Sequence, residues 1–84
     1  MSESFQHVRE SLMRELITHR SMADADTRRQ EEPAWAQQLD FWLDGAIFWI
    51  VQLQSSDEVG NTGNYSEALT KTRECLDRLQ LLLS

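Results

Sequence analysis

The feature that most constrains the fold is a pair of matching heptad patterns in the second half of the chain. In each pattern, residues recur with spacings of 4, 3, 4, 3 and 4, which is typical of a helix that packs against another helix along one seam. We call these the seam residues: Trp35, Leu39, Trp42, Ala46, Trp49 and Leu53 on the first helix, and Tyr65, Leu69, Thr72, Leu76, Leu79 and Leu83 on the second. The patterns predict a hairpin of two helices, at about 33–54 and 65–83, joined by a loop at 55–64.

The two seams also predict a register. Folded antiparallel, they pair in layers whose residue numbers add to 118, from Leu53 with Tyr65 beside the loop to Trp35 with Leu83 at the far end. The centre of the turn then falls at Val59, inside a stretch rich in Ser, Asn and Gly that is typical of a loop. Spacing and composition therefore agree on the position of the turn.

A further amphipathic helix is predicted at about 3–22 by four residues that share one stripe, namely Phe5, Val8, Leu12 and Leu16. The stretch 23–32 has no large apolar residue, so we expect a linker that ends where Pro33 opens the next helix. No segment alternates with period two for long enough to be a strand. The predicted fold class is therefore all-α, with three helices in a single domain covering 1–84.

The middle helix has more apolar surface than a hairpin can cover. Between residues 41 and 53, apolar side chains point to three sides: the seam, a side with Leu43, Ile47 and Ile50, and a side with Phe41 and Phe48. The last helix covers one side and the first helix covers another, which leaves one side open to another protein. The predicted interface comprises Phe41, Asp44, Gly45, Phe48, Val51 and Gln52. The alternative is that the first helix wraps so that all three sides are covered within one chain.

Small chains often need a disulfide, a metal or oligomerisation to be stable. With one Cys and two His in 84 residues, neither an internal disulfide nor a structural zinc site can form. We therefore predict a homodimer that completes a helical bundle, with Phe41, Gly45 and Phe48 near the two-fold axis. The glycine would allow the second helix to approach closely.

The charge of the chain excludes several classes of partner. A net charge of −6 argues against direct binding to nucleic acid and against a basic anchor on anionic lipid. The apolar stretch 41–53 is too short to span a bilayer and contains Asp44. No basic segment followed by an apolar run opens the chain, so we expect a cytoplasmic location.

The sequence shows no set of residues suited to catalysis. Asp40 and Asp44 lie four residues apart, but no third ligand or base stands beside them. Cys75 has no neighbouring His in the sequence and falls among the seam residues of its helix. We therefore expect no enzymatic activity, no metal or other cofactor and no small-molecule substrate.

Together these features favour a small, acidic, cytoplasmic regulator that binds another protein and occludes it. An anti-activator or an inhibitor, for example of a transcription factor, has this form. Two alternatives remain: a secretion or assembly chaperone that holds an extended client, and a structural homo-oligomeric subunit that binds only itself.

Overall fold

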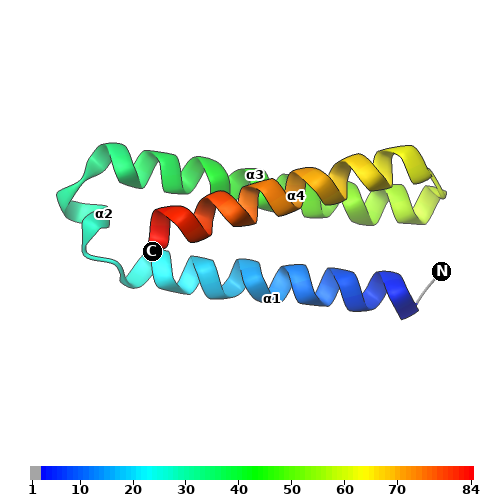
Figure 1. Ribbon diagram of the computed structural model, residues 1–84, viewed down its shortest axis with the longest axis horizontal. Helices are drawn as coiled ribbons and strands as arrows, with labels where there is room; N and C mark the ends of the chain where they lie inside the picture. The colour runs from blue at the N-terminus through cyan, green and yellow to red at the C-terminus, as the bar shows by residue number, and fades with distance from the viewer. Residues whose placement is uncertain (1–2) are drawn as a thin grey trace.

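The computed structural model describes residues 3–84, with side chains described from residue 6 onward. That part of the chain contains four helices and no strand: α1 (Glu3–Ala25), α2 (Arg28–Glu31), α3 (Pro33–Val59) and α4 (Thr62–Leu83). The three long helices lie side by side, with α3 running opposite to α1 and α4 (Figure 1). The molecule is a rod of 44 × 19 × 15 Å. The prediction of an all-α fold is confirmed, although a fourth, short helix joins the three that were expected.

Helices α3 and α4 pack against each other more extensively than any other pair of helices. All the seam residues are buried or half-buried, and six are fully buried: Leu39, Ala46, Leu53, Thr72, Leu76 and Leu79. At the far end of the hairpin, Trp35 Nε1 donates a hydrogen bond of 2.9 Å to the carbonyl oxygen of Leu82. This partner is one residue away from Leu83, which the predicted register placed opposite Trp35.

The turn between α3 and α4 is much shorter than the loop predicted at 55–64. Helix α3 continues to Val59 and α4 begins at Thr62, so Gly60 and Asn61 alone connect them. Gly60 ends α3 because it adopts a left-handed conformation, with φ 72° and ψ 25°, that favours glycine over residues with a side chain.

Backbone groups around this turn are satisfied by local hydrogen bonds. The N–H groups of Gly60 and Asn61 donate to the carbonyl oxygens of Asp57 at 3.2 Å and Ser56 at 2.9 Å, which closes the last turn of α3. Asn61 Oδ1 then accepts a hydrogen bond of 3.1 Å from the N–H of Asn64 and caps α4. The polar composition of 55–59 was misleading, because polar residues are compatible with the final turn of a helix.

The predicted linker at 23–32 is also largely helical. Helix α1 continues to Ala25, and Ala23 is completely buried, since alanine favours a helix and packs closely without a large side chain. The chain leaves the helical conformation at Asp26, whose carboxylate accepts a hydrogen bond of 3.0 Å from the N–H of Arg28. This Asx-type contact begins α2, and Pro33 occupies the first turn of α3.

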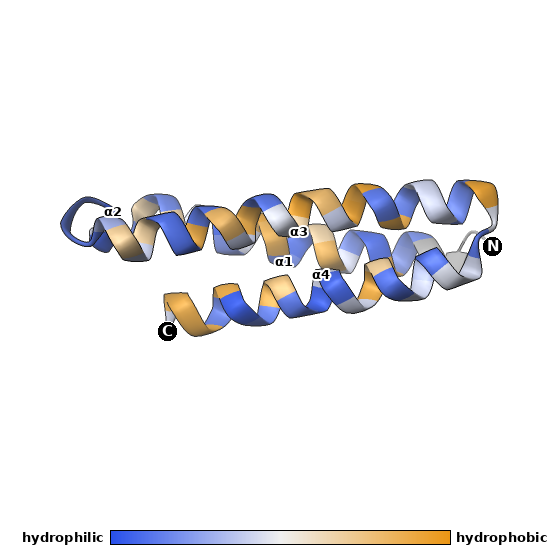
Figure 2. Ribbon diagram, turned by 90° about the horizontal axis from the view of Figure 1, so that it is seen from above, coloured by the Kyte–Doolittle hydropathy of each residue, from blue (hydrophilic) through white to orange (hydrophobic). Residues whose placement is uncertain are grey.

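Helix α1 packs on both members of the hairpin. Leu12 and Leu16 are buried, while the side chain of Phe5 lies outside the described residues. Leu43 and Ile50 of α3 complete this part of the core. In Figure 2 the hydrophobic colour runs through the middle of α3, whereas α4 alternates between hydrophobic and hydrophilic turns.

Candidate interaction surface

The exposed side of α3 has a strip of four aromatic residues, which we call the aromatic face: Phe41, Trp42, Phe48 and Trp49. Phe41 is 66% exposed and Phe48 is 53% exposed, whereas the two tryptophans are half-buried. Each phenylalanine packs edge-on against the tryptophan that follows it, with ring centroids 5.1 and 5.0 Å apart. Because Phe41 and Phe48 are seven residues apart, they lie on the same side of α3, about 10 Å apart along its axis.

The aromatic face lies beside a groove of the hairpin that α1 does not fill. Leu43 and Ile50 are buried in the core that α1 completes. Trp42 packs half-buried against this core and lies beside α4, where the Arg78 guanidinium is 5.7 Å from its ring centroid. The groove beside Trp42 has a volume of about 570 Å³ and is lined by Ala34, Gln37, Gln38, Phe41, Trp42 and Arg78. The alternative in which the first helix covers all three apolar sides of α3 therefore does not hold, since both phenylalanines remain exposed.

Of the other predicted interface residues, Asp44 and Val51 are exposed and Gln52 is half-buried. Val51 is 56% exposed and lies toward α1, where it lines a hollow of about 230 Å³ together with Met13 and Ile47. Apolar surface therefore extends from the aromatic face toward the edge of α1.

Gly45 lies elsewhere, because it faces α4 of its own chain. A Cβ atom at this position would be 3.2 Å from Sγ of Cys75. The close helix approach that the sequence predicted therefore occurs within the hairpin, and the structure does not place Gly45 at the centre of an exposed surface.

The thiol of Cys75 is unsuited to nucleophilic chemistry. Burial raises its pKa, and the negative charge of Glu74 raises the pKa further. At neutral pH the group is therefore protonated, and it is 4% exposed.

The two carboxylates of α3 have different surroundings. Asp40 accepts hydrogen bonds of 3.0 and 3.4 Å from the guanidinium of Arg29, which raises the pKa of that arginine. Asp44 lines the same hollow, of about 310 Å³, but has no ion pair among the described residues. Within residues 3–84, no group of three or more His, Cys, Asp or Glu is arranged to hold a metal ion.

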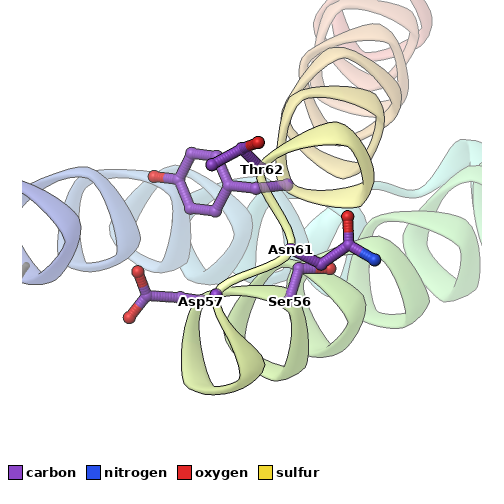
Figure 3. Close-up of a pocket in the computed structure, with 6 residues that line it drawn as sticks. Ser56, Asp57, Asn61 and Thr62 are labelled. Carbon is purple, nitrogen blue, oxygen red and sulfur yellow. The ribbon is translucent and has the colours of Figure 1, made fainter.

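A small cavity of about 100 Å³ lies at the turn between α3 and α4 (Figure 3). It is lined by Ser56, Asp57, Gly60, Asn61, Thr62 and Tyr65. Burial raises the pKa of the Tyr65 hydroxyl, and the charge of Asp57 raises it further. Ligand pockets usually measure about 300–1,000 Å³, so this cavity is small for a substrate.

Sequence reasoning missed three contributors to the surface. Trp42 and Trp49 were assigned to the seam alone, yet both also contact the exposed phenylalanines. Arg78 was not singled out, although the predicted register pairs Trp42 with Leu76, two residues earlier on α4. That spacing was the available signal for the contact between Arg78 and Trp42.

Comparisons with models of protein families, with curated proteins and with solved structures find no match to this chain. None of the helices described between residues 3 and 84 combines the length and apolar content needed to cross a membrane.

Proposed function

We propose that this chain is a small regulatory protein that binds another protein through the aromatic face and occludes it. The observation that carries this proposal is that Phe41 and Phe48 stay more than half exposed after α1 and α4 have packed on α3. Exposed apolar patches on small proteins usually mark interaction sites. Aromatic side chains are also enriched among the residues that dominate binding energy.

The charge of the chain indicates the chemistry of its partner. With a net charge of −6, the protein attracts a folded partner whose own apolar pocket has a basic rim. Asp44, exposed beside the aromatic face and without an ion pair among the described residues, would meet that rim. Binding of this kind would block the surface that the partner uses for its own contacts, as in an anti-activator or an inhibitor.

The proposal is tested by capture from a lysate of the source organism, with three forms of the tagged protein. Wild type is compared with Phe48→Glu and with Leu81→Glu, which places the same charge on an α4 side chain that is 69% exposed. Leu81 lines a separate hollow with Asp77, Gln80 and Ser84, and none of these four residues lines the groove beside Trp42. We expect wild type and Leu81→Glu to retain one protein in stoichiometric amount, and Phe48→Glu to lose it, as measured by quantitative mass spectrometry.

Two outcomes would contradict the proposal. Equal capture by Phe48→Glu and wild type would show that binding does not use the aromatic face. Retention of many unfolded proteins, rather than one folded partner, would instead favour a chaperone.

A further inference from the structure

We propose that in the free protein the aromatic face is covered by a second copy of the chain, in a two-fold dimer whose α3 helices run parallel. In this dimer Asp44 of each copy lies opposite Arg78 of the other. The inference rests on the proposed function, because dimerisation and partner binding use the same face.

The aromatic face has one charged edge on each side. Asp44 lies on the side of α1, where it lines a hollow with Arg20 and Asp24. Arg78 lies on the side of α4, with its guanidinium over the ring of Trp42. The exposed phenylalanines of α3 lie between these two edges, so the surface has an acidic border and a basic border.

Neither of the two edge charges has an ionic partner among the residues whose side chains the structure describes. Some nearby charged groups are paired, namely Asp40 with Arg29 at 3.0 Å and Lys71 with Glu74 at 3.8 Å. Across the described residues, Asp44 has no ion pair, and Arg78 has only its contact with an aromatic ring. Both charges are therefore free to pair with another molecule.

The heights of the two charges along the rod match. Arg78 lies beside Trp42, and Trp42 precedes Asp44 by two residues, which is about 3 Å along a helix axis. A two-fold axis parallel to the helices exchanges the acidic and basic edges, so that Asp44 of one copy and Arg78 of the other lie at nearly the same height. Phe41 and Phe48, at heptad spacing, then each meet their own counterpart.

An antiparallel arrangement has the opposite electrostatics. A two-fold axis perpendicular to the helices places each edge of the aromatic face opposite the same edge of the second copy. Asp44 would then face Asp44, and Arg78 would face Arg78. Like charges placed opposite each other repel. The close approach of helices at Gly45 does not favour such an axis, because Gly45 faces Cys75 of its own chain. Charge complementarity therefore selects the parallel dimer.

Sedimentation equilibrium with charge variants tests the pairing. Asp44→Arg and Arg78→Asp should each raise the dimer dissociation constant roughly tenfold, because two attractive contacts per dimer become repulsive. The double variant Asp44→Arg/Arg78→Asp should restore wild-type association. Asp77→Arg makes the same charge change next to Arg78 but on a different side of α4, and it should have little effect. Single variants that dimerise like wild type would overturn the proposal.

Cross-linking at an exposed position of α3 reports whether the two α3 helices of the dimer run parallel or antiparallel. Phe48→Cys should be joined to its own copy by a short bismaleimide, whereas wild type should not react because Cys75 is buried. A mixture of Phe41→Cys and Phe48→Cys should give little of the mixed product. Preferential formation of that mixed product would indicate antiparallel helices and would overturn the proposal.

Failure of this inference can be distinguished from failure of the proposed function. A wild-type protein that is monomeric at about 50 μM, well above a micromolar dissociation constant, refutes the dimer. If that monomer still captures a partner that Phe48→Glu loses, the proposed function stands. A parallel dimer that captures no partner would instead leave the chain as a structural homo-oligomer.

Discussion

At the scale of single residues, Gly45 sets how closely α3 approaches α4. A methyl group there would lie 3.2 Å from Sγ of Cys75, which is closer than a comfortable van der Waals contact. Glycine in the interior of a helix costs about 1 kcal/mol relative to alanine. The chain therefore carries an unfavourable residue in α3 at a point where a larger one would press on its neighbour.

We predict that Cys75→Ala changes the effect of Gly45→Ala on the free energy of unfolding from neutral or unfavourable to favourable. Gly45→Ala alone should be neutral or slightly destabilising, because the propensity gain is offset by the contact with Sγ. In a Cys75→Ala background the same substitution should raise the free energy of unfolding by up to about 1 kcal/mol. Urea denaturation of the four proteins measures this coupling. Equal effects of Gly45→Ala in both backgrounds would show that Sγ does not limit the approach.

At the scale of elements, the corner between α1 and α3 depends on the two arginines of α2. Arg28 pairs with Asp26 at 2.7 Å and places its guanidinium 4.4 Å from the ring centroid of Trp35. Arg29 donates to the carbonyl oxygen of Ala23 at 3.3 Å and pairs with Asp40. These contacts connect the end of α1, the short helix α2 and the start of α3. Residues 23–32, which run from the last turn of α1 to the residue before α3, have no large apolar side chain.

We predict that this corner contributes to the pH dependence of stability. The hydrogen bond from the Arg28 side chain holds the pKa of Asp26 below its usual value. The ionised carboxylate of Asp26 is stabilised in the folded state. Its contribution to the free energy of unfolding is therefore complete above about pH 5 and is lost as the pH falls through the lowered pKa. Asp26→Asn should therefore lose less stability than wild type between pH 6 and pH 3 in urea denaturation at low salt.

The effect should be modest and should shrink in high salt, because the pair is partly exposed. Asp77→Asn is the matched control, since Asp77 is exposed and has no ion pair among the described residues. An acid response of Asp26→Asn that equals that of wild type and of Asp77→Asn would exclude a role for the pair.

The elements also show what the sequence can predict and what it cannot. The heptad spacing identified the packed sides of α3 and α4, because periodicity directly reflects which side of a helix is buried. The ends of α1 and α3 were placed too early, because polar residues such as Ser55 and small ones such as Ala23 signal a loop in composition but fit a helix. The contact of Gly45 with Cys75 depends on how closely α4 lies beside α3, which the spacing of residues along α3 does not reveal.

At the scale of the whole molecule, the hairpin has two grooves and the chain supplies one helix to fill them. Helix α1 fills the groove beside Leu43 and Ile50, and the groove beside Trp42 remains open. The fold is therefore a bundle with room for a further helix on one side. Its stability depends on the docking of α1, and its proposed binding activity depends on the side that α1 leaves free.

We predict that two substitutions five residues apart on α1 have very different effects. Leu12 is completely buried, so Leu12→Ala should lower the free energy of unfolding by about 2–5 kcal/mol. Ile17 is 62% exposed, so Ile17→Ala should change it by no more than about 0.5 kcal/mol. Urea denaturation measures both. Similar costs at the two positions would mean that α1 docks through a different side.

The position of the tryptophans has a consequence for optical measurements on this chain. All three tryptophans lie on α3, the tyrosine lies on α4, and α1 has neither. Intrinsic fluorescence therefore monitors the environment of the hairpin, whereas far-UV circular dichroism counts the residues of every helix. If α1 detaches and unfolds before the hairpin opens, ellipticity will fall while the emission wavelength stays constant. Coincident curves from the two signals will instead show that the three long helices unfold as one unit.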